Sequence, residues 1–114
     1  MASNLLVVLT NPSEGQEEAY NRWYDEVHVH EVVQVPGFRS AQRFRLAPAQ
    51  MGEPGDHRYL AIYEIDVPPE DALAALQAAF PQMRMSKAVD MKSVSARMFE
   101  PLGETVTRPA SAVG

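Results

Sequence analysis

The chain has 114 residues, 46% of them hydrophobic, with a formal net charge of −5 and no cysteine. This length suits one domain, and the lack of cysteine excludes disulfides, zinc–cysteine sites and iron–sulfur clusters. The acidic balance, with no basic tract, argues against nucleic acid or an anionic membrane as partner, and no segment reaches the length of a membrane span. Because the N-terminus has no signal-peptide pattern, we expect a cytoplasmic protein.

The first predicted element is a strand at residues 5–9. Its apolar run is unbroken rather than alternating, which is typical of a strand covered on both faces and central in its sheet. Pro12 ends this strand. Ser13 and Gln16 then have the spacing of a capping box, which predicts the start of a helix.

This helix carries its aromatic side chains on one face. On a helical wheel that face holds Tyr20, Trp23, Tyr24, Val27 and Glu31. We expect it to be buried. Val32 and Val33 would lie on the polar side if the register continued, so we expect an irregularity near residues 28–30 before Pro36 and Gly37 end the helix.

A second strand is predicted at residues 38–46, where polar and apolar side chains alternate. In this alternation Phe38 and Ser40 share one face, and Arg39 and Arg43 share the other. One face of the strand is therefore markedly basic.

The rest of the chain contains a loop, two further strands and a helix. Residues 47–56 are rich in proline and glycine and predict a surface loop, and residues 58–65 predict a third strand that is apolar on both faces. Residues 68–80 begin with proline and acidic residues and continue at helical spacing, which predicts the second helix. Residues 93–100 alternate as the last strand, and residues 103–114 form a polar tail outside the domain of residues 1–102.

The element order is strand, helix, strand, strand, helix, strand, which is the split β-α-β plan of ferredoxin-like α+β domains. Right-handed crossovers place both helices on one face of an antiparallel sheet. The other face still carries apolar side chains from the two central strands, and nothing in the chain is left to cover it. We therefore expect a homodimer in which a second copy covers this face.

Three segments resemble the signature of the EthD-like proteins: NRWYDEVH at residues 21–28, VPGF at residues 35–38 and YLAIYE at residues 59–64. The resemblance extends over residues 5–99, although the family usually has proline where this chain has His30. It implies a ferredoxin-like protomer, a dimeric α+β barrel built from two sheets, and a pocket between helices and sheet. Such barrels host cyclases, isomerases, dehydratases, monooxygenases and heme enzymes, so the resemblance implies a fold and no single activity.

His28 is the leading candidate for acid–base chemistry, because an ordinary histidine pKa of about 6.5 allows proton exchange near neutrality. Tyr24 lies four residues earlier on the same helix and could share a ligand with it. Glu31 could orient the imidazole or stabilise its protonated form. The alternative is structural: His28 caps a helix end and Glu31 pairs with an arginine.

Four further side chains could line an apolar pocket that binds a hydrophobic small molecule: Trp23, Arg43, Tyr59 and Tyr63. Core packing is the alternative, since aromatics at helix and strand spacing are packing residues more often than ligand contacts. His28 and His30 point to different sides of a helix, and no motif identifies a heme ligand. We therefore expect no metal and no cofactor.

Three functions fit these residues. The first is a cofactor-independent lyase or isomerase, of cyclase or dehydratase type, that acts on a hydrophobic cyclic or aromatic carbonyl compound with His28 as acid and base. The second is a non-catalytic dimeric protein that binds such a compound for a catabolic or biosynthetic pathway. The third is a cofactor-free monooxygenase on the same barrel. A buried, hydrogen-bonded His28 beside a free cavity would favour catalysis, and a solvent-facing His28 would favour the binding protein.

Overall fold

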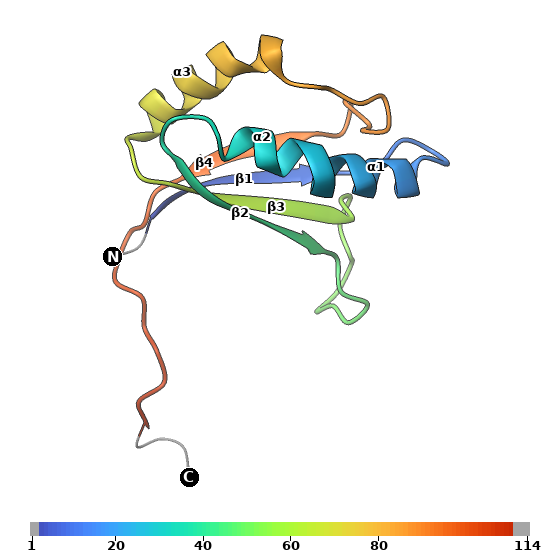
Figure 1. Ribbon diagram of the computed structural model, residues 1–114. Coiled ribbons are helices and arrows are strands. Elements are labelled where there is room, and N and C mark those ends of the chain that lie inside the picture. The colour runs from blue at the N-terminus through green and yellow to red at the C-terminus, as the bar shows by residue number, and fades with distance from the viewer. Residues whose placement is uncertain (1–2, 111–114) are drawn as a thin grey trace.

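The computed structural model describes residues 3–110, and it has two layers (Figure 1). A four-stranded antiparallel sheet with the order β2-β3-β1-β4 forms one layer, and the helices lie together on one of its faces. The strands are β1 (Asn4–Thr10), β2 (Phe38–Arg45), β3 (Tyr59–Ile65) and β4 (Ser95–Phe99). The predicted α+β order and antiparallel sheet are confirmed.

The helical layer has two parts. The first is a continuous run of α1 (Glu17–Trp23), a π-helical turn η1 (Tyr24–His28) and α2 (Val29–Val32). The second is α3 (Pro69–Ala79), followed by a 3-10 turn η2 (Phe80–Gln82). No helix among residues 3–110 is long and apolar enough to cross a membrane. Residues 103–110 of the tail extend away from the sheet, and the last four residues lie outside the described part of the chain.

The start of α1 differs from the predicted capping box. The helix begins at Glu17, and Gln16 makes no capping hydrogen bond with its side chain. Ser13 Oγ instead donates to the carbonyl oxygen of Lys87 over 2.9 Å, and the Ser13 amide donates to Ala88 O over 2.6 Å. The serine therefore joins two distant loops, a tertiary contact that outcompetes the local cap.

The register of β2 also differs from simple alternation. A β-bulge lies between Phe38, which pairs with Ile65, and Ser40, which pairs with Glu64. The extra residue places Phe38 in the core and leaves Ser40 on the opposite face, where it hydrogen bonds to Glu64. The prediction that Phe38 and Ser40 share a face was wrong, because one inserted residue reverses the faces that follow it.

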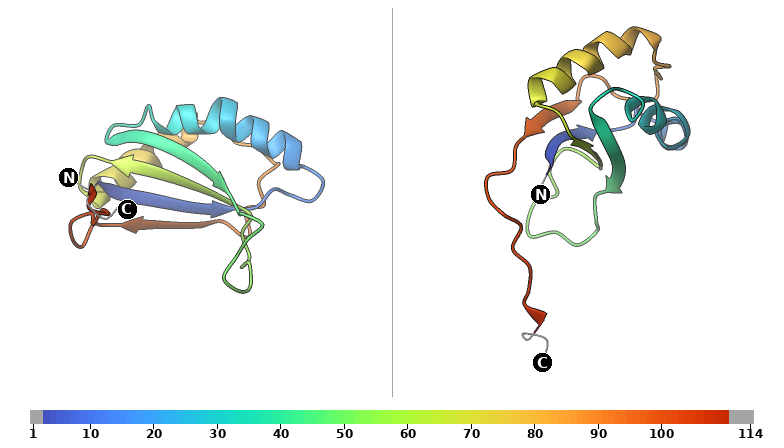
Figure 2. Two further views of the ribbon diagram at one scale, coloured as in Figure 1. Left: turned by 90° about the horizontal axis from the view of Figure 1, so that it is seen from below. Right: turned by 60° about the vertical axis from the view of Figure 1, so that its left-hand side comes forward.

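The core fills the space between the helices and the sheet. Its most buried large side chains are Tyr20, Tyr63 and Ile65. The opposite sheet face carries half-buried side chains from β1 and β3, and Phe44 and Phe99 on the edge strands are 39% and 53% exposed. No described helix or strand covers this open face (Figure 2).

Gly37 lies in the turn between the first helical run and β2, in a backbone conformation that other residues rarely adopt. The helix was predicted to end at Pro36 and Gly37, but α2 already ends at Val32. The φ of Gly37 is +93°, and a Cβ atom at this position would lie 2.5 Å from Val67 Cγ2. We expect Gly37→Ala to lower the free energy of unfolding by about 2–4 kcal/mol, because a positive φ costs ~1–2 and overpacking ~1–3 kcal/mol. Urea denaturation measures this, with Gly15→Ala as control: Gly15 has a φ of +76° and open space around it. An equal loss of stability in both variants would show that the contact with Val67 contributes nothing to the effect.

Candidate functional site

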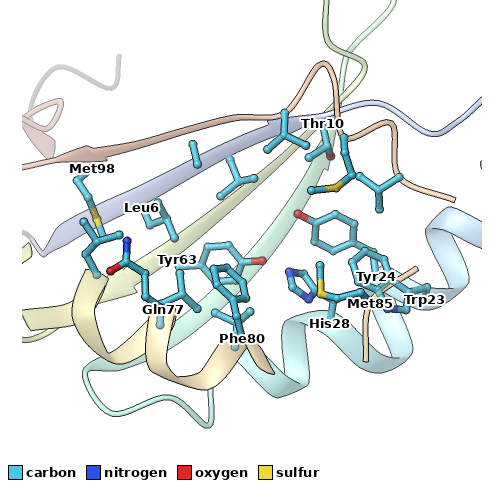
Figure 3. Close-up of a pocket in the computed structure, with 18 residues that line it drawn as sticks. Leu6, Thr10, Trp23, Tyr24, His28, Tyr63, Gln77, Phe80, Met85 and Met98 are labelled. Atoms are coloured by element: carbon cyan, nitrogen blue, oxygen red, sulfur yellow. The ribbon is translucent and has the colours of Figure 1, made fainter. Parts of the chain in front are cut away.

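A cavity of about 330 Å³ lies between the two helical parts and the sheet (Figure 3). Its floor comes from β1, β3 and β4, and its walls come from the first helical run, from α3 and from residues 83–94, which we call the strap. The rim is apolar and exposed, with Leu73 44%, Phe80 41% and Met85 54% accessible. None of the side chains that line the cavity is aspartate, glutamate, lysine or arginine.

The π-helical turn positions His28 in this cavity. The imidazole of His28 stacks on the Trp23 indole, with ring centres 4.5 Å apart and planes 19° apart, and it meets the Tyr24 ring edge-on at 5.1 Å. On a regular α-helix two residues five apart would point about 140° away from each other. The wider i to i+5 turn over Tyr24–His28 therefore allows Trp23 and His28 to stack. The expected irregularity is present and starts four residues earlier than predicted.

Two buried polar atoms of this site have no hydrogen-bond partner among the described residues: His28 Nδ1 and the hydroxyl of Tyr63. Both side chains line the cavity, and the Tyr63 hydroxyl points toward the His28 ring (Figure 3). Buried polar atoms are nearly always hydrogen bonded, so an unpaired pair facing a cavity marks a place where a ligand can bind. His28 is thus half-buried beside a free cavity, with its Nδ1 atom buried, but this atom lacks the hydrogen bond that was expected for catalysis.

Burial sets the protonation of these groups. Loss of solvation lowers the pKa of His28 to about 4, against a smaller opposing effect of Glu31. Burial also raises the pKa of Tyr63 and that of Tyr24 above the usual tyrosine value. At neutral pH the site therefore presents an uncharged imidazole and two protonated phenols.

The depressed pKa of His28 predicts acid sensitivity. Between pH 6.5 and 4 the unfolded chain binds a proton at His28 that the folded protein does not, so stability falls as the pH falls. We expect this residue alone to remove about 2–3 kcal/mol of stability between pH 7 and pH 4. Urea denaturation of wild type and His28→Gln at both pH values measures the difference, with the exposed His30→Gln as control. An equal acid loss in wild type and His28→Gln would contradict the prediction.

The predicted site residues fall into two groups. Trp23, Tyr24, His28 and Tyr63 line the cavity together. Glu31 lies outside it: its carboxylate accepts hydrogen bonds from the backbone N–H of Arg84 at 3.1 and 3.3 Å, and Arg84 Nε lies 3.4 Å away. Glu31 thus pairs with an arginine, as the structural alternative expected, although the shorter contacts are with the backbone N–H of Arg84 and not with its guanidinium.

Arg43 and Tyr59 lie behind the aromatic helix face, outside the cavity. The Arg43 guanidinium sits 4.4 Å from the centre of the Tyr24 ring and bonds to Asp25 at 2.7 Å and Asn21 at 2.8 Å. The Tyr59 hydroxyl donates to Glu17 and accepts from Asn21. Arg43 therefore supports the back of Tyr24 and does not face the cavity.

The sequence analysis did not predict the residues that α3, η2, the strap and β4 contribute to the cavity. Gln77 reaches the cavity from α3 and Phe80 from η2. Met85 and Met91 reach it from the strap, and Met98 from β4. The helical spacing of residues 73–80 indicated an apolar face, but the strap has no periodicity from which its inward side could be read. Methionine-rich walls are typical of adaptable binding surfaces.

No group of three histidine, cysteine, aspartate or glutamate side chains able to hold a metal ion occurs within residues 3–110. His30 is exposed, and His57 Nε2 lies 2.6 Å from the carbonyl oxygen of Ser93 in a distant loop.

No protein-family model and no curated protein sequence matches the chain. Several solved structures match it in fold. The heme-degrader MhuD of Mycobacterium tuberculosis, whose structure has two hemes in its active site, matches with a TM-score of 0.58 at 19% identity, over 90% of this chain and 99% of that one. An EthD family protein of Bacillus halodurans C-125 matches with a TM-score of 0.56 at 16% identity, over 90% and 100%.

The fold is therefore that of the EthD-like, ferredoxin-like α+β barrel proteins. A protein of Shewanella loihica PV-4, provisionally described as a monooxygenase, has the same fold, with a TM-score of 0.55 at 13% identity over 90% and 97% of the chains. At these identities the likeness establishes the EthD-like fold alone, without an activity.

Proposed function

We propose that the chain is a cofactor-independent enzyme of lyase or isomerase type, with its active site in the cavity at His28. The observation that carries this proposal is the pair of unpartnered buried atoms, His28 Nδ1 and the Tyr63 hydroxyl, beside an apolar cavity. A solvated surface histidine would not need a ligand to complete its hydrogen bonds, whereas these two groups do.

The cavity favours a neutral, mostly apolar ligand. Its walls carry no ionic side chain, and an unpaired charge brought into such a site would lose its hydration without compensation. A volume of about 330 Å³ lies at the small end of the range for ligand pockets. A hydrophobic cyclic or aromatic carbonyl compound meets both conditions.

The protonation states suit proton transfer on such a compound. His28, neutral at pH 7, accepts a proton from carbon, and Tyr63 donates a hydrogen bond to the carbonyl oxygen on which negative charge develops. Because a base with a pKa near 4 is weak, the substrate must carry an acidic position, such as a carbon between two carbonyl groups. Returning the proton to another atom completes an isomerisation, and giving it to a departing hydroxyl completes a dehydration.

The second candidate is a cofactor-free monooxygenase. It is favoured by the fold neighbours, one a heme-degrader and one provisionally described as a monooxygenase. A neutral His28 could accept the proton of an electron-rich phenol, and the phenolate would then react with oxygen. Oxygen consumption with such phenols would separate this reaction from isomerisation, and ligand binding without any turnover would favour the non-catalytic binding protein.

Heme fits these residues poorly. His28 could serve as an axial ligand, but no cationic side chain lines the cavity to receive the propionate groups. The absence of a cofactor stays a prediction, which spectroscopic titration with heme can test.

Tyr63→Phe tests the site directly. Removing an unpaired buried hydroxyl should leave stability unchanged or raise it by up to ~1 kcal/mol, and it should weaken binding of carbonyl ligands about 3- to 10-fold. Thermal shifts with a panel of hydrophobic phenols and lactones measure both effects. Tyr59→Phe is the control, because Tyr59 bonds to Glu17 and Asn21 outside the cavity. Equal ligand shifts in wild type and Tyr63→Phe would remove Tyr63 from the site.

A further inference from the structure

The strap is fastened differently at its two ends. Its far end is tied to the body through backbone groups: Asp90 N–H donates to Asn11 O over 2.9 Å, and Val89 forms a β-bridge with Pro12. Its near end, at Arg84, is held by side chains of the first helical run. Met85, which follows Arg84, lines the cavity, so this near end forms part of the cavity wall.

Two helix side chains hold the backbone groups of Arg84. The Glu31 carboxylate accepts the Arg84 N–H at 3.1 Å, and Trp23 Nε1 donates to the Arg84 carbonyl oxygen over 2.7 Å. The same indole stacks on His28 at 4.5 Å. Contacts therefore run without a break from Glu31, through Arg84 and Trp23, to the imidazole.

We propose that Glu31 is a positioning residue, which holds the Arg84 backbone so that the Arg84 carbonyl fixes Trp23 and the closed strap keeps water away from His28. The proposal rests on the proposed role of His28 in the site. It assigns Glu31 no contact with substrate, because its carboxylate lies outside the cavity and is bonded to Arg84.

If Glu31 holds the strap, its removal should raise the pKa of His28, whereas the loss of its charge alone should lower that pKa. The negative charge of Glu31 raises the pKa of His28, so removing the charge alone must lower that pKa further. Releasing the strap would instead hydrate His28 and raise its pKa from about 4 toward 6.5. The sign of the change therefore distinguishes the two effects.

The groups that face the His28 imidazole from the neighbouring elements are phenols and apolar side chains. Tyr24 and Tyr63 face the imidazole, and their pKa values are raised above the usual tyrosine range by burial. The Arg43 guanidinium lies behind the Tyr24 ring, 4.4 Å from its centre. The residues of α3 and of the strap that line the cavity include no titratable side chain.

The chain carries its own probe, because Trp23 is its only tryptophan. A protonated imidazole stacked on an indole quenches its fluorescence, so the emission of Trp23 against pH reports the protonation of His28. Wild-type emission should be flat between pH 6 and 8, where His28, with a pKa of about 4, is neutral. The measurement uses the full chain without ligand, so its failure leaves the ligand tests of the proposed function untouched.

Three substitutions of Glu31 separate its hydrogen bond from its charge. Glu31→Ala loses both, and Glu31→Asp keeps the charge but is one methylene too short to reach Arg84. In both variants the midpoint of the Trp23 emission against pH should shift upward toward 6.5. Glu31→Gln keeps an acceptor for the Arg84 N–H and should show no upward shift. Arg84→Ala, which keeps the backbone N–H, should behave as wild type. Any other order of these midpoints, in variants whose circular dichroism at pH 7 matches wild type, overturns the proposal.

Discussion

His28→Gln should abolish nearly all turnover while leaving the fold intact. General acid–base groups typically contribute about 10²- to 10⁴-fold to rate, and a loss of this size is expected once a substrate is identified. The melting temperature at pH 7 should barely change, because the cavity-facing Nδ1 makes no hydrogen bond within the described residues that the substitution would break.

The measurement combines single-substrate kinetics with thermal unfolding, and the exposed His30→Gln is the matched control. A purely structural His28 predicts a different pattern. In that case stability should fall by roughly 1–3 kcal/mol, and activity should fall only in proportion to folded protein. Equal thermal shifts of wild type and His28→Gln with every ligand of the phenol and lactone panel would also remove His28 from the site.

Wild type should be a dimer at micromolar concentration, and Ile62→Lys should be a monomer. Ile62 pairs with Val7 at the centre of the open sheet face, where no described helix or strand covers the apolar side chains. A monomer would expose a contiguous apolar patch of a kind that soluble monomers rarely carry, and a lysine at its centre would place an unpaired charge in the interface.

Light scattering measures both masses. The control is Ala74→Lys, an equal gain of charge on the exposed side of α3. A wild-type monomer, or an Ile62→Lys variant with the same mass as wild type, would contradict the dimer. The predicted cytoplasmic location can be tested separately by cell fractionation.

The candidate site was partly predictable. Tyr24 and His28 were found because they are four residues apart on one aromatic helix, and Trp23 and Tyr63 because they are aromatic at helix and strand spacing. Tyr59 was predicted from the same spacing and Arg43 as a polar group of the pocket, yet both lie on the other side of the Tyr20 and Tyr24 rings. Spacing tells which side chains share an element, but it does not tell on which side of a neighbouring ring they come to lie.

The sequence by itself determined the element order, the two central strands that are apolar on both faces and the glycine turn at Gly37 before β2, because each depends on local periodicity or on backbone freedom. Only the tertiary structure decided the bulge after Phe38, the hydrogen bond from Ser13 to Lys87 and the hydrogen bond from the Arg84 N–H to Glu31. These features join segments far apart in the chain, and their energies depend on which groups meet after folding. The strap lines the cavity for the same reason: it has no periodic pattern of its own, and its inward side is set by the groups to which it is fastened.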